Sequence, residues 1–200
     1  SWSQQAYIKS SNNDANDNFG YSMSIDGDTL AVSAQGEDSN QNTITNGSTS
    51  SDDNSAAYSG AVYIYTRSGT EWTQQSYIKP SNAVADGGFG SSVSLKGDIL
   101  VVGAQGEDSN ATTITNGDNA SSDTSVETSG AVYVFKRSGT SWSQIAYIKA
   151  ANSRAAINFG MNVALDNTTI IVGSPWENSN QQGITNGTSA STNTSGGSQA

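Results

Sequence analysis

The 200-residue chain contains no cysteine and no histidine. Without thiols, neither disulfide bonds nor thiolate chemistry can operate in this sequence. The lack of histidine also excludes Ser–His and Cys–His nucleophile pairs, together with the usual zinc and copper sites. The sequence therefore predicts a protein that is not an enzyme.

Positive charge is also scarce, because 8 basic residues stand against 18 acidic ones and give a net charge of −10. A nucleic-acid binder shows a basic stripe, so we expect no nucleic-acid partner and no adsorption to anionic membranes. No apolar run approaches the roughly 20 residues of a membrane span, and no signal-peptide pattern is present. We therefore expect no membrane insertion.

What the sequence does contain is a threefold repeat with a period of 70 residues, which places tryptophans at 2, 72 and 142. The stretch "NFGYSMSIDGDTLAVSAQGEDSN" recurs as "GFGSSVSLKGDILVVGAQGEDSN" and "NFGMNVALDNTTIIVGSPWENSN". A fixed long period indicates one supersecondary unit stacked on copies of itself. We expect a single region over 1–200, with repeats of about 1–67, 68–137 and 138–200, the last of them incomplete.

Each repeat unit contains four short apolar stretches rich in Val, Ile, Tyr and Trp, as strands prefer. In the first unit they are Ser22–Ile25, Thr29–Ala34, Gly60–Arg67 and Trp72–Lys79, and tight turns separate the first from the second and the third from the fourth. Four antiparallel strands make one blade of a β-propeller. The predicted fold class is all-β with three such blades, the second strands lying near the axis and the Trp strands further out.

Two long polar stretches, Gly36–Ser59 and Gly106–Ser129, interrupt this pattern. Both carry "GEDSN" and "ITNG" at the same offsets, so we expect a defined path for each. Loops of this length in a compact domain are usually functional or mobile.

The order of motifs resembles that of the bacterial FG-GAP repeat proteins. The motifs are Phe-Gly, then "LAVSAQGEDSN" or "LVVGAQGEDSN", then "SGAVYVF", then "WSQQAYIK". These proteins are similar in turn to the N-terminal β-propeller of integrin α subunits. The resemblance implies a secreted or surface-exposed propeller used for cell adhesion or ligand binding, often with calcium.

Acidic side chains in the long loops are the candidate calcium ligands, because Ca²⁺ takes six to eight oxygen ligands. The Asp-Gly hairpins are too short to wrap a cation. The alternative is that these carboxylates are solvated charges or accept backbone N–H bonds at turns. The candidates are Glu37, Asp38, Asp52 and Asp53 in one loop, and Glu107, Asp108, Asp118 and Asp123 in the next.

A tryptophan marks the third copy of this loop, where Trp176 replaces Gly36 and Gly106. Trp176 is a candidate ligand contact, since its ring could stack on a sugar. The alternative, which we favour, is that it covers a neighbouring blade. The third copy keeps only one of the acidic pair, Glu177, so we expect it to be the weakest calcium site.

The two ends of the sequence look complementary. No counterpart of "AVYIYTR" follows Asn186, and Trp2–Lys9 is a strand without a preceding hairpin. We expect Trp2–Lys9 to complete a sheet with residues outside this segment, either a continuation of the polypeptide or another copy.

Three functional hypotheses follow. The first is a non-catalytic extracellular module that binds a protein or glycan ligand at a cell surface. The second is a structural building block that assembles by strand complementation into a ring or filament. The third is a carbohydrate-binding, lectin-like propeller, which the resemblance also allows.

Overall fold

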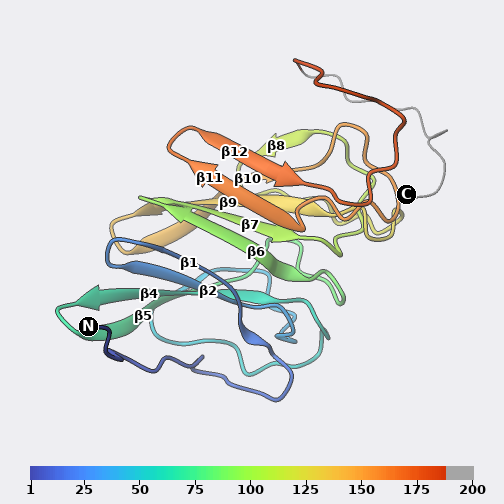
Figure 1. The fold of residues 1–200 in the computed structure, drawn as a ribbon. Coiled ribbons are helices and arrows are strands. Elements are labelled where there is room, and N and C mark those ends of the chain that lie inside the picture. Colours follow the sequence, from blue (N-terminus) through green and yellow to red (C-terminus); the bar gives the residue numbers. More distant parts are fainter. Residues whose placement is uncertain (188–200) are drawn as a thin grey trace.

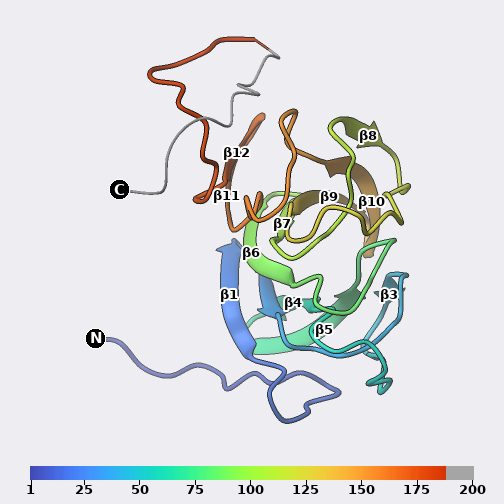
Figure 2. The ribbon, with the colours of Figure 1, turned by 90° about the vertical axis from the view of Figure 1, so that its right-hand side faces the viewer.

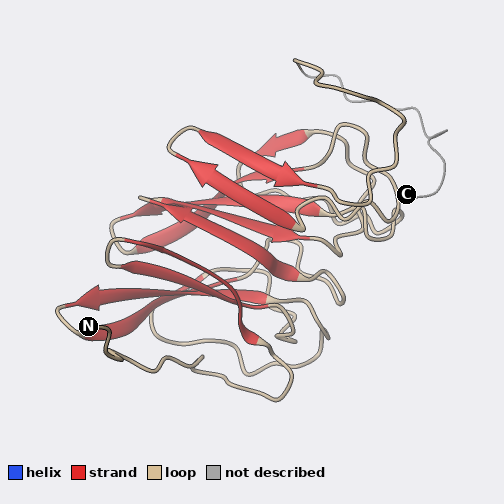
Figure 3. Cartoon of the chain, viewed as in Figure 1, coloured by secondary structure: helices blue, strands red, loops and turns tan. Residues whose placement is uncertain are grey.

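The computed structural model describes residues 1–187, and their only regular elements are β-strands (Figures 1 and 3). Since this part of the chain has no helix, it has none that is long and apolar enough to cross a membrane. The first sheet contains β1 (Phe19–Asp26), β2 (Thr29–Ala34), β3 (Thr45–Asn46), β4 (Ala61–Ser68) and β5 (Glu71–Ile78). The second contains β6 (Phe89–Lys96), β7 (Ile99–Ala104), β8 (Ile114–Asn116), β9 (Ala131–Ser138) and β10 (Ser141–Ile148), and the third β11 (Asn162–Asp166) and β12 (Thr169–Gly173).

Both large sheets have the same topology. Their strand orders are β1-β2-β4-β5-β3 and β6-β7-β9-β10-β8, and every neighbouring pair is antiparallel. The four predicted strands of each complete unit are thus confirmed, and β3 and β8 add a short fifth strand that the sequence pattern did not predict. We call the sheets blade 1, blade 2 and, for the β11–β12 hairpin, blade 3.

The three blades are stacked so that their first strands lie side by side, while the outer strands fan out (Figure 2). The backbone N–H groups of Val93 and Leu95 in β6 donate to Ser22 and Ser24 in β1, at 3.1 and 3.0 Å. The second strands β2 and β7, expected near the axis, lie one place further out than the first strands of their sheets. The inner position belongs to β1, β6 and β11, because the serines of an edge strand can satisfy the edge N–H groups of the next sheet.

The hydrophobic core lies between the blades. Ala31, Val62 and Ile64 on the far face of blade 1 join one buried cluster with Phe89 and Leu100 on the near face of blade 2. A second cluster connects the far face of blade 2 with the β11–β12 hairpin. Each blade therefore buries its apolar side chains mainly against the next blade, as a stacked repeat requires.

Blades and sequence repeats have different boundaries. Blade 1 runs from β1 to β5, so its long outer strand β5, beyond which only the short β3 lies, comes from the second predicted repeat. Trp2–Lys9, expected to be a strand, is not in a sheet within the described residues, since it has no partner strand there. Its Gln5 side chain accepts a hydrogen bond from Trp72 at 3.3 Å, in the way that Gln75 accepts one from Trp142 at 3.1 Å. The segment therefore lies where the outer strand of a preceding blade would lie, and its completion of a sheet stays a prediction.

Candidate functional site

The two long loops follow the same path at the same end of their blades (right-hand side of Figure 1). The amide of Ala56 donates to the carbonyl of Asp38 at 2.7 Å, and Val126 donates to Asp108 at the same distance. This agreement confirms the expected defined path, and it shows that the loop structure is encoded in the repeat.

A buried ion pair anchors the first loop to its blade. Glu37 and Lys79 are each only 1% exposed, and Lys79 Nζ lies 2.8 Å from Glu37 Oε2. Tyr77 donates its hydroxyl to Glu37 Oε1 at 2.7 Å, and Lys79 also donates to the Ser59 hydroxyl at 2.7 Å. Both charges are thus paired and hydrogen-bonded, which a buried ion pair needs in order to be tolerated.

Blade 2 repeats this arrangement. Lys149 Nζ lies 2.6 Å from Glu107 Oε2, while Tyr147 donates to Glu107 Oε1 at 2.8 Å. In the third repeat Arg154 takes over the role of the cation and pairs with a more exposed carboxylate, Glu177. The lysine anchor is therefore shared by blades 1 and 2, whereas Glu177 pairs with a cation from a different position of its repeat.

Burial controls the protonation of these groups. It lowers the pKa of Lys79 and Lys149, and the partner glutamates oppose that shift. Burial, together with the adjacent Glu37, raises the pKa of Tyr77 well above its ordinary value. The phenol therefore stays protonated and donates to the carboxylate. The structure thus uses Glu37 and Glu107, both predicted calcium ligands, as loop anchors.

Sequence reasoning missed the partners of these glutamates. The motif "YIK" recurs with the repeat period as Tyr77–Lys79 and Tyr147–Lys149. A lysine fixed at the end of an apolar strand is unusual unless its charge is paired. That signal could have indicated a buried partner for each glutamate.

The aspartates next to these glutamates support the backbone of the loop. Asp38 accepts a hydrogen bond from the amide of Tyr58 at 2.8 Å, and Asp108 accepts one from Thr128 at 2.6 Å. Tyr58 and Thr128 have positive φ angles of 55° and 49°. A positive φ is uncommon in residues other than glycine, so the carboxylates stabilise a backbone conformation that Tyr58 and Thr128 would not favour by themselves.

Asp53 and Asp123 close a tight turn in each loop. Asp53 Oδ1 accepts from the amides of Asn40 and Ser55, at 2.9 and 3.2 Å. Asp123 accepts from Asn110 and Ser125 in the same way, at 3.0 and 3.1 Å. Hydrogen bonds from the Ser125 hydroxyl and from these amides lower the pKa of Asp123, and those from the Asn40 amide and the Ser55 hydroxyl lower the pKa of Asp53.

The remaining predicted residues are placed differently. Asp52 and Asp118 are exposed in their loops. Within residues 1–187, no three acidic side chains form a group that could hold a metal ion. The structure therefore does not bring the four carboxylates of either loop together, and calcium binding stays a prediction. Trp176 is 41% exposed, so its ring is partly packed and partly open to solvent, and its contact with a ligand also stays a prediction.

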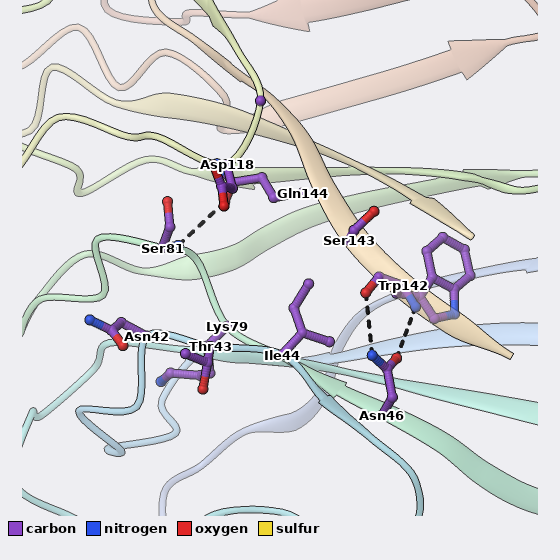
Figure 4. A pocket seen from close by; sticks show the side chains of 11 residues that line it. Asn42, Thr43, Ile44, Asn46, Lys79, Ser81, Asp118, Trp142, Ser143 and Gln144 are labelled. Carbon is purple, nitrogen blue, oxygen red and sulfur yellow. Dashed lines mark hydrogen bonds between the residues drawn. The ribbon is translucent and has the colours of Figure 1, made fainter. Parts of the chain in front are cut away.

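A pocket of about 450 Å³ lies between the loop of blade 1 and the outer strand of blade 2 (Figure 4). Asn42, Thr43 and Ile44 line it from blade 1, and Asp118 and Gln144 line it from blade 2. Its volume falls within the roughly 300–1,000 Å³ of small-molecule sites. The sequence pattern gave no sign of this pocket, because its two walls come from residues 42–46 and from residues 117–118 and 142–144, which are far apart in the chain.

Asn46 forms one wall of the pocket and joins the two blades. Its Oδ1 accepts from the backbone N–H of Trp142 at 2.8 Å, and its Nδ2 donates to the Trp142 carbonyl at 3.4 Å (Figure 4). This double contact gives the asparagine of the first "ITNG" motif a role in joining blade 1 to blade 2. The indole of Trp142 is only 2% exposed, so it offers no stacking surface to a ligand in the pocket.

Comparison with known families gives one result. A sequence model of the FG-GAP repeat matches residues 2–50, 72–135 and 142–189. No curated protein matches the chain at a significant level.

Proposed function

Because the chain belongs to the FG-GAP repeat family, we propose that its propeller blades form a non-catalytic, extracellular module for adhesion or ligand binding. The observation that carries the proposal is the buried pairing of Glu37 with Lys79, repeated in blade 2. It holds a long polar loop in a fixed shape on a rigid sheet, which is the arrangement that binding surfaces commonly use.

The types of residue available for catalysis support the same proposal. The sequence lacks the histidine and cysteine of the common nucleophile systems. Its most buried carboxylates are paired with lysines, so they are not free to exchange protons with a substrate. A loop that is anchored in this way serves recognition better than proton transfer.

The test replaces residues 48–55 of the first loop, which follow β3, with a Gly-Ser linker, so the Glu37 anchor and the contact between Asn46 and Trp142 are kept. Wild-type and variant proteins are then compared by biolayer interferometry on immobilised extracellular matrix proteins and glycans. We expect binding by the wild type and loss of it in the variant, with an unchanged circular dichroism spectrum. Absence of binding to every surface, or full binding by the variant, contradicts the proposal.

A second candidate function is assembly, because both ends of the stack expose apolar side chains. Ile25 in β1 is 59% exposed, whereas its repeat equivalent Leu95 is 5% exposed between blades. At the other end Ile171 is 66% exposed, whereas its equivalent Val101 is fully buried. Each face therefore resembles one half of an internal interface, and a second copy could dock head to tail.

Charge weakens this second candidate near neutral pH. Inside the chain, Asp26 of blade 1 pairs with Lys96 of blade 2 at 2.9 Å. In a head-to-tail dimer, blade 1 of one copy would follow blade 3 of the other, as blade 2 follows blade 1 within the chain. Asp26 of one copy would then lie beside Asp166 of the other, and two like charges repel. Light scattering at several concentrations tests this candidate: a constant monomer mass at pH 7 and pH 4 would eliminate assembly.

A further inference from the structure

Two buried polar groups without a hydrogen-bond partner lie together at the pocket between blades 1 and 2. They are the hydroxyl of Ser81 and the amide nitrogen of Gln144. Gln144 is only 8% exposed, and its Oε1 accepts from the Ser81 amide at 3.3 Å (Figure 4). Its Nε2 is left as a buried donor without an acceptor, which is costly unless another molecule supplies one.

Blade 1 shows what is missing. There Gln74, the repeat equivalent of Gln144, donates to the hydroxyl of Ser50 at 3.2 Å. The same hydroxyl lies 2.5 Å from that of Ser11, the equivalent of Ser81. In the second repeat the position of Ser50 is occupied by Ala120. The second repeat therefore lacks the hydroxyl that pairs both groups in the first, and Gln144 also lacks a counterpart of the second acceptor of Gln74, the Thr49 carbonyl at 3.3 Å.

We propose that the pocket binds a neutral ligand with adjacent hydroxyl groups, such as a saccharide, one of whose hydroxyls replaces the missing serine hydroxyl. A hydroxyl accepts a hydrogen bond from the Gln144 amide and exchanges a second one with Ser81. This inference rests on the proposed binding function and assigns that function a site and a ligand class.

The charges of the pocket favour a neutral polyhydroxyl compound over an anion. Of its two charged lining residues, Lys79 has a fully buried side chain that is paired with Glu37. The other, Asp118, is exposed and repels anions but accepts hydrogen bonds from hydroxyl groups. The neutral amides and hydroxyls of Asn42 and Thr43 complete the wall, and they suit the same ligand class.

The test uses isothermal titration calorimetry with cello-, malto- and mannotetraose on the whole chain. The decisive variant is Ala120→Ser, which supplies the hydroxyl from within the protein. We expect at least one tetrasaccharide to bind the wild type, and about tenfold weaker binding by Ala120→Ser, because the ligand hydroxyl then has to displace an internal partner. The melting temperature of this variant should be equal or higher.

Two further variants keep the result interpretable. Gln144→Met removes the unpaired donor and should weaken binding to a similar extent, while Ser50→Ala, in the first repeat, should leave the affinity unchanged. The inference is overturned if none of the three saccharides binds, or if Ala120→Ser and Gln144→Met bind as well as the wild type. Binding of matrix proteins without any saccharide overturns the inference but leaves the binding function intact, whereas binding to nothing at all removes both.

Discussion

Lys79 and Glu37 form a fully buried ion pair, 2.8 Å between Nζ and Oε2, that connects the end of the outer strand β5 to the start of a long loop. The two residues are 42 positions apart in the chain. In blades 1 and 2 such a pair fixes the long, irregular loop to the end of a long strand. Such a contact is stable only while both partners are present.

Removal of one partner should be severe. We expect Lys79→Met to lower the free energy of unfolding by about 3–5 kcal/mol, because it leaves the Glu37 carboxylate buried and unpaired. The double variant Glu37→Gln, Lys79→Met should lose less than Lys79→Met alone. Asp28→Asn, which breaks the exposed pair with Arg67, is the control and should cost less than about 1 kcal/mol. Urea titration measures all three, and equal losses for Lys79→Met and Asp28→Asn would contradict the prediction.

A glycine at the blade interface should not tolerate a side chain. Gly60 has a φ of 78°, and a Cβ there would collide with the backbone oxygen of Phe89 in the next blade. We expect Gly60→Ala to cost about 2–4 kcal/mol, from backbone strain and the clash together. Gly69 has a φ of 62° but open space around it, so Gly69→Ala should cost only about 1 kcal/mol. The prediction fails if thermal unfolding gives the two variants the same stability.

The contact between Asn46 and Trp142 should contribute to the stacking of the blades. Asn46→Ala removes two hydrogen bonds across the interface and should cost about 1–2 kcal/mol. The repeat-equivalent Asn116 is exposed and has no such contact with another blade in the described part of the chain, so Asn116→Ala should change stability by less than about 0.5 kcal/mol. Hydrogen exchange of the Trp142 amide provides a local measure, and unchanged protection in Asn46→Ala would refute the role of this contact.

Acid should weaken the loops in a defined pH range. Hydrogen bonds hold the pKa of Asp53 and Asp123 below the ordinary value of 3.8, so both carboxylates stabilise the fold fully above about pH 4. That contribution is lost as the pH falls through the lowered pKa values, because the folded state then has to bind protons that the unfolded state already holds. The stability advantage of the wild type over Asp53→Asn should therefore be present at pH 6 and shrink below about pH 4. A difference that is constant from pH 6 to pH 2 would contradict this account.

Calcium binding by the loops can be measured as a difference in melting temperature with and without a chelator. If the loops bind calcium, the ion stabilises the folded state by mass action, and Asp38→Ala or Asp108→Ala should reduce the difference. The difference is the proper measure, since both aspartates also support turns without the ion. Asp98→Asn, in a hairpin, should leave it unchanged. A melting temperature that does not respond to the chelator would rule out calcium in these loops.

The sequence alone determined the blade pattern. Short runs rich in Val, Ile and Tyr, tight turns and a strict period predict β4, β5, β9 and β10 closely, because strand preference and hairpin turns are local properties. The repeat also predicted that both long loops have a defined path. These features depend on residues that are near one another in the chain.

Only the tertiary structure decided how the charged and polar side chains are used. From the sequence, Glu37 in its polar loop was predicted to be a metal ligand. Only the folded chain reveals Lys79 beside it, because the role of a buried charge depends on a partner that is distant in the sequence. In the same way, the difference between Ser50 and Ala120 looks minor in the sequence. It becomes significant once the fold places Ser81 and Gln144 around the missing hydroxyl, because hydrogen-bond satisfaction depends on three-dimensional neighbours and not on chain order.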